Sequence, residues 1–357
     1  MDKRRIMTVA MAAVIAVCCF FGGCAQSDNE HSSSAADESS QMTSELSAQD
    51  SRSDGSSASS APEYSQESSG NTESKASSDS DGTITPRIYE ITDDEGHKLY
   101  TMGAIHIADA SILNMPEYFN TAFAESDAVA VECDPSDDEP GDSSITKLTY
   151  PDGTKITDHV SAEDYQKVVN IVSASPHYSD EFIYVMPMKW LALGEEVVAK
   201  SIGMDVSYGV DSILIEKAKK DGKEILEVEG DQFQTDLMVN MPEKIQNYLF
   251  HHMAETDKYV EITGKAYMES YESWKKGELA TGNQEGNDTL SESEKELLYE
   301  YYRIMRMDRN LGMAEKAEEY LASGKTVFMA VGSAHFYGKG GIYDLMEQKG
   351  YNVRQIY

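Results

Sequence analysis

The sequence predicts an α/β fold with a mixed, largely parallel central sheet that is flanked by helices. Short apolar runs alternate with helical segments from residue 84 to the C-terminus, and this alternation is typical of sheets whose strands are joined by helices. Two of the runs, 128–131 and 326–331, are apolar at nearly every position. Such runs are typical of strands that are buried on both faces.

The elements follow one another without an internal boundary, so 84–357 is expected to be one globular domain. Strands are expected at 98–102, 128–131, 224–228, 326–331 and 351–356. Helices are expected at 116–126, 210–220, 291–322 and 342–349, and most of 163–277 is helical as well.

The composition excludes several classes of protein. The 357 residues include 63 Asp and Glu against 30 Lys and Arg, for a formal net charge of −33. A chain this acidic repels phosphate backbones, so we expect no nucleic-acid partner. Three of the four cysteines lie in the first 24 residues. Only Cys133 remains in the body of the protein, so no intramolecular disulfide forms there.

The N-terminus has the pattern of an export signal. Basic residues at 3–5 precede an uncharged apolar run at 6–21, which is shorter than the roughly 20 residues of a bilayer span. The run ends in Gly-Gly-Cys at 22–24 and resembles a bacterial lipoprotein signal. We therefore expect 1–24 to be the signal peptide and Cys24 to carry the lipid. An uncleaved membrane anchor is the alternative, and both place the domain at the extracytoplasmic face of the cell membrane.

Residues 25–83 are rich in serine and acidic side chains and poor in large apolar ones. Such a segment buries too little apolar surface to offset the entropy lost on folding. It is predicted to be a disordered tether between the lipid and the globular domain.

Four of the predicted strands are followed by side chains that are suited to metal or acid–base chemistry. Two Gly-x-x-His motifs end at His106 and His335, and two other strands lead into Glu132 and Glu229. Ligands of open α/β sheets bind beyond the carboxyl ends of the strands, so these side chains are expected to converge. The glycines permit a tight bend after the strand and close approach of the backbone to a ligand.

This set of donors suits a divalent transition metal, Mn, Co or Zn, with positions left open for water and substrate. The alternative for each histidine is a capping or hydrogen-bonding role without chemistry.

These motifs and other fragments resemble, in their order and spacing, the TraB/PrgY/GumN family, which includes the Tiki proteases. The fragments lie at 99–106, 126–132, 186–190, 209–211, 228–234, 274–277, 309–314 and 331–341. The resemblance covers roughly 88–357. It implies an erythromycin-esterase/ChaN-like α/β fold and, in the Tiki branch, a metal-dependent peptidase that uses both Gly-x-x-His motifs.

Carried over to this chain, the resemblance implies that His106, His335 and Glu132 bind the metal. Glu132 and Glu229 are expected to act as ligands or general base, taking a proton from metal-bound water. Arg309 is expected to hold a substrate carboxylate or the developing oxyanion. The alternative for Arg309 is an ion pair that attaches the long helix to the acidic body.

Two functions follow from these observations. The first is a lipid-anchored, extracytoplasmic, metal-dependent hydrolase that cuts a peptide or protein substrate. The second is a non-catalytic surface protein that binds or sequesters a peptide signal, as the PrgY branch suggests. No particular oligomeric state is predicted.

Overall fold

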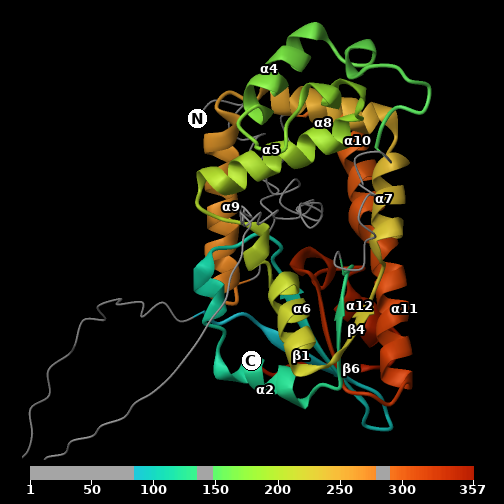
Figure 1. Cartoon of the computed structure of the whole chain (residues 1–357). Coiled ribbons are helices and arrows are strands. Elements are labelled where there is room, and N and C mark those ends of the chain that lie inside the picture. The colour runs from blue at the N-terminus through green and yellow to red at the C-terminus, as the bar shows by residue number, and fades with distance from the viewer. Residues whose placement is uncertain (1–83, 135–147, 279–289) are drawn as a thin grey trace, which may run out of the picture. The chain divides into compact units, whose positions relative to one another are not determined.

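The computed structural model describes residues 84–134, 148–278 and 290–357 (Figure 1). The predicted signal peptide, the lipidation at Cys24 and the tether lie outside these residues and stay predictions. Within them the predicted α/β fold is confirmed, with helices on both faces of a six-stranded mixed sheet. No helix among the described residues is both long and apolar enough to cross a bilayer.

The sheet has the order β4-β3-β5-β2-β1-β6. Its strands are β1 (Ile88–Thr92), β2 (Lys98–Ala104), β3 (Ala128–Val131), β4 (Glu224–Glu227), β5 (Val327–Gly332) and β6 (Asn352–Gln355). Neighbours among β4, β3, β5 and β2 are parallel, whereas β1 is antiparallel to both β2 and β6. The four parallel strands therefore end at one edge, called here the carboxyl edge. Five strands match the predicted ones, and β1 was not predicted.

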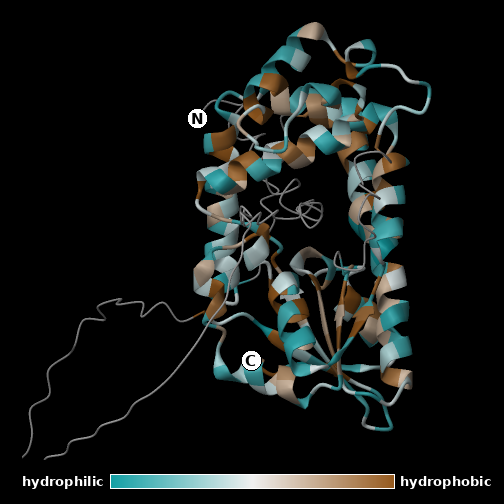
Figure 2. Ribbon diagram, in the orientation of Figure 1, coloured by the Kyte–Doolittle hydropathy of each residue, from teal (hydrophilic) through white to brown (hydrophobic). Residues whose placement is uncertain are grey.

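Two apolar layers cover the faces of the sheet. Helices α2 (Glu117–Glu125), α6 (Val210–Asp221) and α9 (Tyr259–Lys275) pack on one face, and α11 (Asp308–Ala322) and α12 (Ile342–Gln348) pack on the other. The four residues of β3 are all apolar because both faces of the strand are covered. Val129 and Val131 contact the first layer, and Ala128 and Ala130 contact the second. Figure 2 shows the central strands as mostly hydrophobic and the helices as mixed.

The remaining helices form a layer with an apolar core of its own (Figure 1). They are α4 (Ala162–Val172), α5 (Pro187–Ser201), α7 (Asp231–Val239), α8 (Glu243–Glu255) and α10 (Glu292–Tyr302). Trp190 of α5 lies in this core, where its indole N–H donates to the carbonyl of Val185 at 3.1 Å. Short 3-10 helices occupy Ala110–Leu113, Ile156–Asp158, Asp180–Tyr184, Val206–Tyr208 and Ser333–His335.

Capping residues account for several helix ends. Helix α10 begins after Ser291, whose hydroxyl and backbone N–H exchange hydrogen bonds with Glu294 in a capping box. Helix α6 ends at Gly222, whose φ of 70° is costly for residues with a side chain. The helical stretch predicted at 291–322 is confirmed from Glu292 to Ala322, with one turn of π-helix at Arg303–Met307 joining α10 to α11. Such turns are frequent at functional sites.

The helical layer should make the stability of the protein depend on pH through His252 of α8. Burial, helped by the charge of His251, lowers the pKa of His252 to about 4. The unfolded chain binds this proton near pH 6.5 and the folded chain only near pH 4, so stability is lost as the pH falls between these values. We expect the wild type to lose about 3 kcal/mol more unfolding free energy than His252→Gln between pH 7 and pH 4.

Urea unfolding at both pH values measures this difference. The matched control is His177→Gln, because His177 is exposed, pairs with Glu196 at 2.9 Å and is not among the groups that shift the pKa of His252. Equal losses in the wild type and in His252→Gln would contradict the prediction.

Candidate functional site

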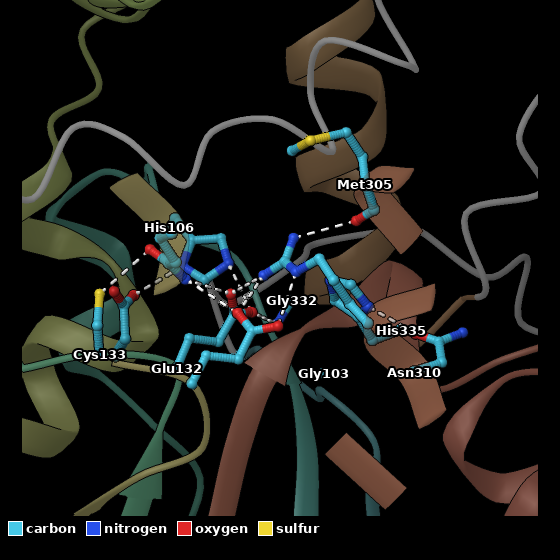
Figure 3. A network of polar contacts seen from close by, with 12 residues as sticks. Gly103, His106, Glu132, Cys133, Met305, Asn310, Gly332 and His335 are labelled. Atoms are coloured by element: carbon cyan, nitrogen blue, oxygen red, sulfur yellow. Dashed lines mark hydrogen bonds and ion pairs between the residues drawn. The ribbon is translucent and has the colours of Figure 1, made fainter. Parts of the chain in front are cut away.

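The structure brings the four predicted strand-end residues to the carboxyl edge of the sheet. Figure 3 shows three of them, His106, Glu132 and His335. Glu132 directly follows β3 and His106 follows β2 by two residues, while Glu229 follows β4 by two. His335 closes the 3-10 turn after β5, which lies between β3 and β2. The parallel register therefore places these residues together, although their positions in the sequence are far apart.

Arg309, in the first turn of α11, lies at the centre of this group and is only 3% exposed. Its Nε and Nη2 atoms donate to the two carboxylate oxygens of Glu229 at 2.8 and 2.7 Å. Nη2 also donates to Glu132 at 2.8 Å, and Nη1 to the carbonyl of Met305 at 3.1 Å. The guanidinium thus already bonds two carboxylates of the protein, as the ion-pair alternative for Arg309 predicts.

Glu132 is held from several sides. Its Oε1 accepts the backbone N–H of Gly332 at 2.6 Å, and its Oε2 accepts the amide of Gln234 at 3.1 Å as well as Arg309. Burial raises the pKa of Glu132, and this effect outweighs the attraction of Arg309 and His106. Gln234 in turn accepts the Cys133 thiol at 3.3 Å, which orients its amide toward the carboxylates.

His106 lies between two carboxylates. Its Nδ1 is 3.3 Å from Oδ1 of Asp211, and its Nε2 is 3.7 Å from Oε1 of Glu132. Burial lowers the pKa of His106, but the charges of Asp211 and Glu132 outweigh burial and raise it overall. The pKa of Glu132 is raised as well, so each member of the His106–Glu132 pair holds a proton more tightly than the free side chain does.

Glycine allows the helix that carries Asp211 to approach the strand end. A Cβ atom on Gly209, the residue before α6, would lie 2.6 Å from the carbonyl oxygen of His106. The N–H of Val210 donates to the carbonyl of Ile105 at 2.9 Å. The first turn of α6 is thereby fixed against the loop that presents His106.

The tautomer of His335 is set by its neighbours. Asn310 donates its amide N–H to the carbonyl of Gly340 at 2.8 Å, so its Oδ1 accepts the Nδ1 proton of His335 at 2.7 Å. Burial, helped by the charges of Arg309 and Arg306, lowers the pKa of His335 well below its ordinary value. The ring is therefore neutral at pH 7, with its lone pair on Nε2.

The first motif glycine has a different role from the predicted bend. Gly103 lies within β2, and a Cβ atom there would lie 2.7 Å from Cβ and 2.8 Å from Cα of Ser333. Its carbonyl accepts the indole N–H of Trp274 at 2.7 Å. Gly103 thus permits close packing between β2 and the turn that carries His335.

The side chains fit the predicted metal only in part. The partners of His106 and His335 at Nδ1 make Nε2 the possible ligand atom of each ring, which is the usual arrangement of metal-binding histidines. Glu132, the predicted third ligand, is instead bonded to Arg309, Gln234 and Gly332. Across 84–134, 148–278 and 290–357 no three His, Cys, Asp or Glu side chains are arranged to hold a metal ion. The predicted three-ligand set therefore does not fit as it is placed.

Sequence reasoning assigned no role to Asp211 or Gln234, although both lie within fragments of the family resemblance. The available signal for Asp211 was an acidic residue in the first turn of a helix, directly after a Gly-Val pair.

Comparison with known proteins identifies the family of the chain. The model of the TraB/PrgY/gumN family matches residues 88–355. The chain belongs to the TraB/PrgY/gumN family. The match spans β1 to β6 and includes every residue of the site described above, so the resemblance drawn from the motifs is confirmed.

Two TraB/PrgY/gumN relatives are similar over most of their length. The uncharacterized protein YbaP of Escherichia coli (strain K12) is 24% identical over 258 residues, which cover 72% of this chain and 90% of YbaP. YbaP of Shigella flexneri is 24% identical over 248 residues, which cover 69% of this chain and 87% of that protein. No solved structure matches the chain.

Proposed function

We propose that this TraB/PrgY/gumN protein is a hydrolase of peptide bonds, held at the extracytoplasmic face of the cell membrane by a lipid on Cys24. The proposal rests on one observation, the line from half-buried Asp211 through half-buried His106 to buried Glu132 at the carboxyl edge. The two carboxylates raise the pKa of the imidazole above its ordinary value, and such perturbed groups are typical of acid–base catalysts.

The roles follow from the protonation states. Neutral His335 has its lone pair on Nε2 and accepts a proton from water as the water attacks the peptide carbonyl. The His106–Glu132 pair gives its proton to the leaving amine. Asp211 accepts the Nδ1 proton and so directs Nε2 of His106 toward Glu132. Arg309 keeps Glu132 in place by ion pairing.

A divalent metal, Mn, Co or Zn, stays a proposal from the resemblance, and no step above passes through it. His106 and His335 would hold it through their Nε2 atoms, so with metal bound these atoms would not transfer the protons described above, and the metal would instead supply Lewis-acid activation of water. Elemental analysis of the protein purified without chelator tests this. Metal that is bound by the wild type and lost from the His106→Ala/His335→Ala double variant supports the metal, and no metal in either contradicts it.

One observation favours the non-catalytic alternative, a surface protein that sequesters a peptide. The guanidinium of Arg309 bonds both Glu132 and Glu229, and such a closed ion-pair network can serve to stabilise a binding surface alone. Under this second proposal the wild type binds peptides and releases no fragments.

Glu132→Gln separates the two functions. Gln keeps the shape of the side chain and an oxygen for the Gly332 N–H, but it cannot share a proton with His106. We expect peptide cleavage to fall by about 10²- to 10⁴-fold, measured by mass spectrometry on a mixture of synthetic peptides. The control is Glu227→Gln, an exposed carboxylate at the end of β4. Wild-type protein that binds these peptides without cutting them would contradict the hydrolase.

A further inference from the structure

Arg306 lies in the π-helical turn, three residues before Arg309, and is half-buried. Its Nη2 donates to the backbone carbonyl of Tyr337 at 2.5 Å. Tyr337 lies in the loop that follows His335, and Asn310 of α11 is bonded to Gly340 of the same loop. The guanidinium is thus fixed beside the segment that presents the neutral histidine.

The charge of Arg306 is not balanced by the part of the chain that the structure describes. Arg303, Arg309 and Arg354 each pair with a carboxylate there, whereas Arg306 has no such pair. Burial lowers the pKa of Arg306, and the nearby phenol of Tyr302 counteracts this only in part. A partly buried cation without a counter-ion is costly, so an incoming anion gains more free energy here than at an exposed arginine.

The surroundings leave room for an anion. A Cβ atom placed on Gly338 would meet only one atom within 4 Å, Nη2 of Arg306 at 3.8 Å. The side of the loop next to the guanidinium is therefore open. The charge of Arg306 also reaches His335, whose pKa it helps to lower. An anion at Arg306 would thus lie close to the proposed general base.

We propose that Arg306 binds a carboxylate of the substrate peptide, and so positions the peptide for cleavage beside His335. This inference rests on the proposed function, because it names the substrate class of the same site. Arg309, which was predicted for this task, is already engaged by Glu132 and Glu229. A guanidinium fork suits a carboxylate, whether at the C-terminus of the peptide or on an Asp or Glu side chain.

The test measures retention of N-acetylated random hexapeptide pools on the full-length protein. One pool has free C-termini, a second has C-terminal amides and no acidic residues, and a third has C-terminal amides and one Asp. We expect the wild type to prefer a carboxylate pool over the neutral amide pool by about 10- to 100-fold. Preference for the first pool identifies the C-terminal carboxylate, and preference for the third identifies the side chain.

Arg306→Gln should lose this preference, and Arg306→Lys should keep part of it. The matched control is Arg303→Gln, which makes the same charge change one turn earlier at an exposed residue that pairs with Asp308. Thermal unfolding verifies that each variant is folded. A preference that persists in Arg306→Gln, or that is absent from the wild type, overturns the proposal. The pools are also tested on Glu132→Gln, in which cleavage is expected to be lost and no new carboxylates form, so that failure of this proposal is distinguished from failure of the proposed hydrolysis.

Discussion

Replacing Arg309 by Met should lower the free energy of unfolding by about 3–5 kcal/mol. The substitution leaves the carboxylates of Glu132 and Glu229 buried at the carboxyl edge without the cation that bonds both of them. Removing one partner of a buried ion pair destabilises a protein by far more than the intact pair stabilises it. The reason is that the other charge then stays buried without compensation. Urea denaturation of the wild type and the variant measures the loss.

Two further variants establish the cause of this loss. The triple variant Arg309→Met/Glu132→Gln/Glu229→Gln removes all three charges and should recover most of the stability, since no buried charge is then unpaired. Arg303→Met removes an exposed arginine of the adjacent turn, which pairs with Asp308, and should cost at most about 1 kcal/mol. The ion-pair network would not have the stabilising role described above if Arg309→Met were no less stable than Arg303→Met.

His106→Asn should reduce peptide cleavage by about 10²- to 10⁴-fold, because Asn cannot carry the proton that the leaving amine needs. Initial rates on peptides that the wild type cuts measure this effect. Asp211→Asn keeps an oxygen for Nδ1 of His106 but loses the charge. It should therefore reduce kcat by less than His106→Asn does, with KM unchanged.

The control for histidine loss is His177→Asn. His177 is exposed, and its Nδ1 pairs with Glu196 at 2.9 Å, outside the site. A wild-type rate in His106→Asn would remove His106 from the chemistry and with it the proposed acid.

The central strands and the convergence of their ends were predictable because each signal is local. A run of apolar residues predicts a doubly buried strand, and parallel strands bring their carboxyl ends to one edge. Strand β1 was missed because its five residues, Ile88–Thr92, form neither a continuous apolar run nor a strict alternation of apolar and polar side chains. The π-helical turn was missed because the spacing of apolar residues along the sequence does not show where one turn of a helix holds an extra residue.

The partners within the site were not predictable. Arg309 and Glu132 are separated by 177 positions, and no local pattern links them. The same holds for the pairing of Asp211 with His106 across more than one hundred residues. These pairs form because α6, which carries Asp211, and α11, which carries Arg309, pack on opposite faces of the sheet. That packing cannot be seen in the sequence.

The position of β5 in the sheet has a consequence for biosynthesis. Val327 pairs with Leu99 on one side and with Ala128 on the other, so β5 fills the place between the two earlier strands. Until the ribosome has added this late segment, β2 and β3 keep unpaired edges that invite aggregation. The same strand supplies the N–H that binds Glu132, from 200 positions away. A chain truncated before β5 should therefore be an aggregation-prone fragment rather than a smaller folded domain.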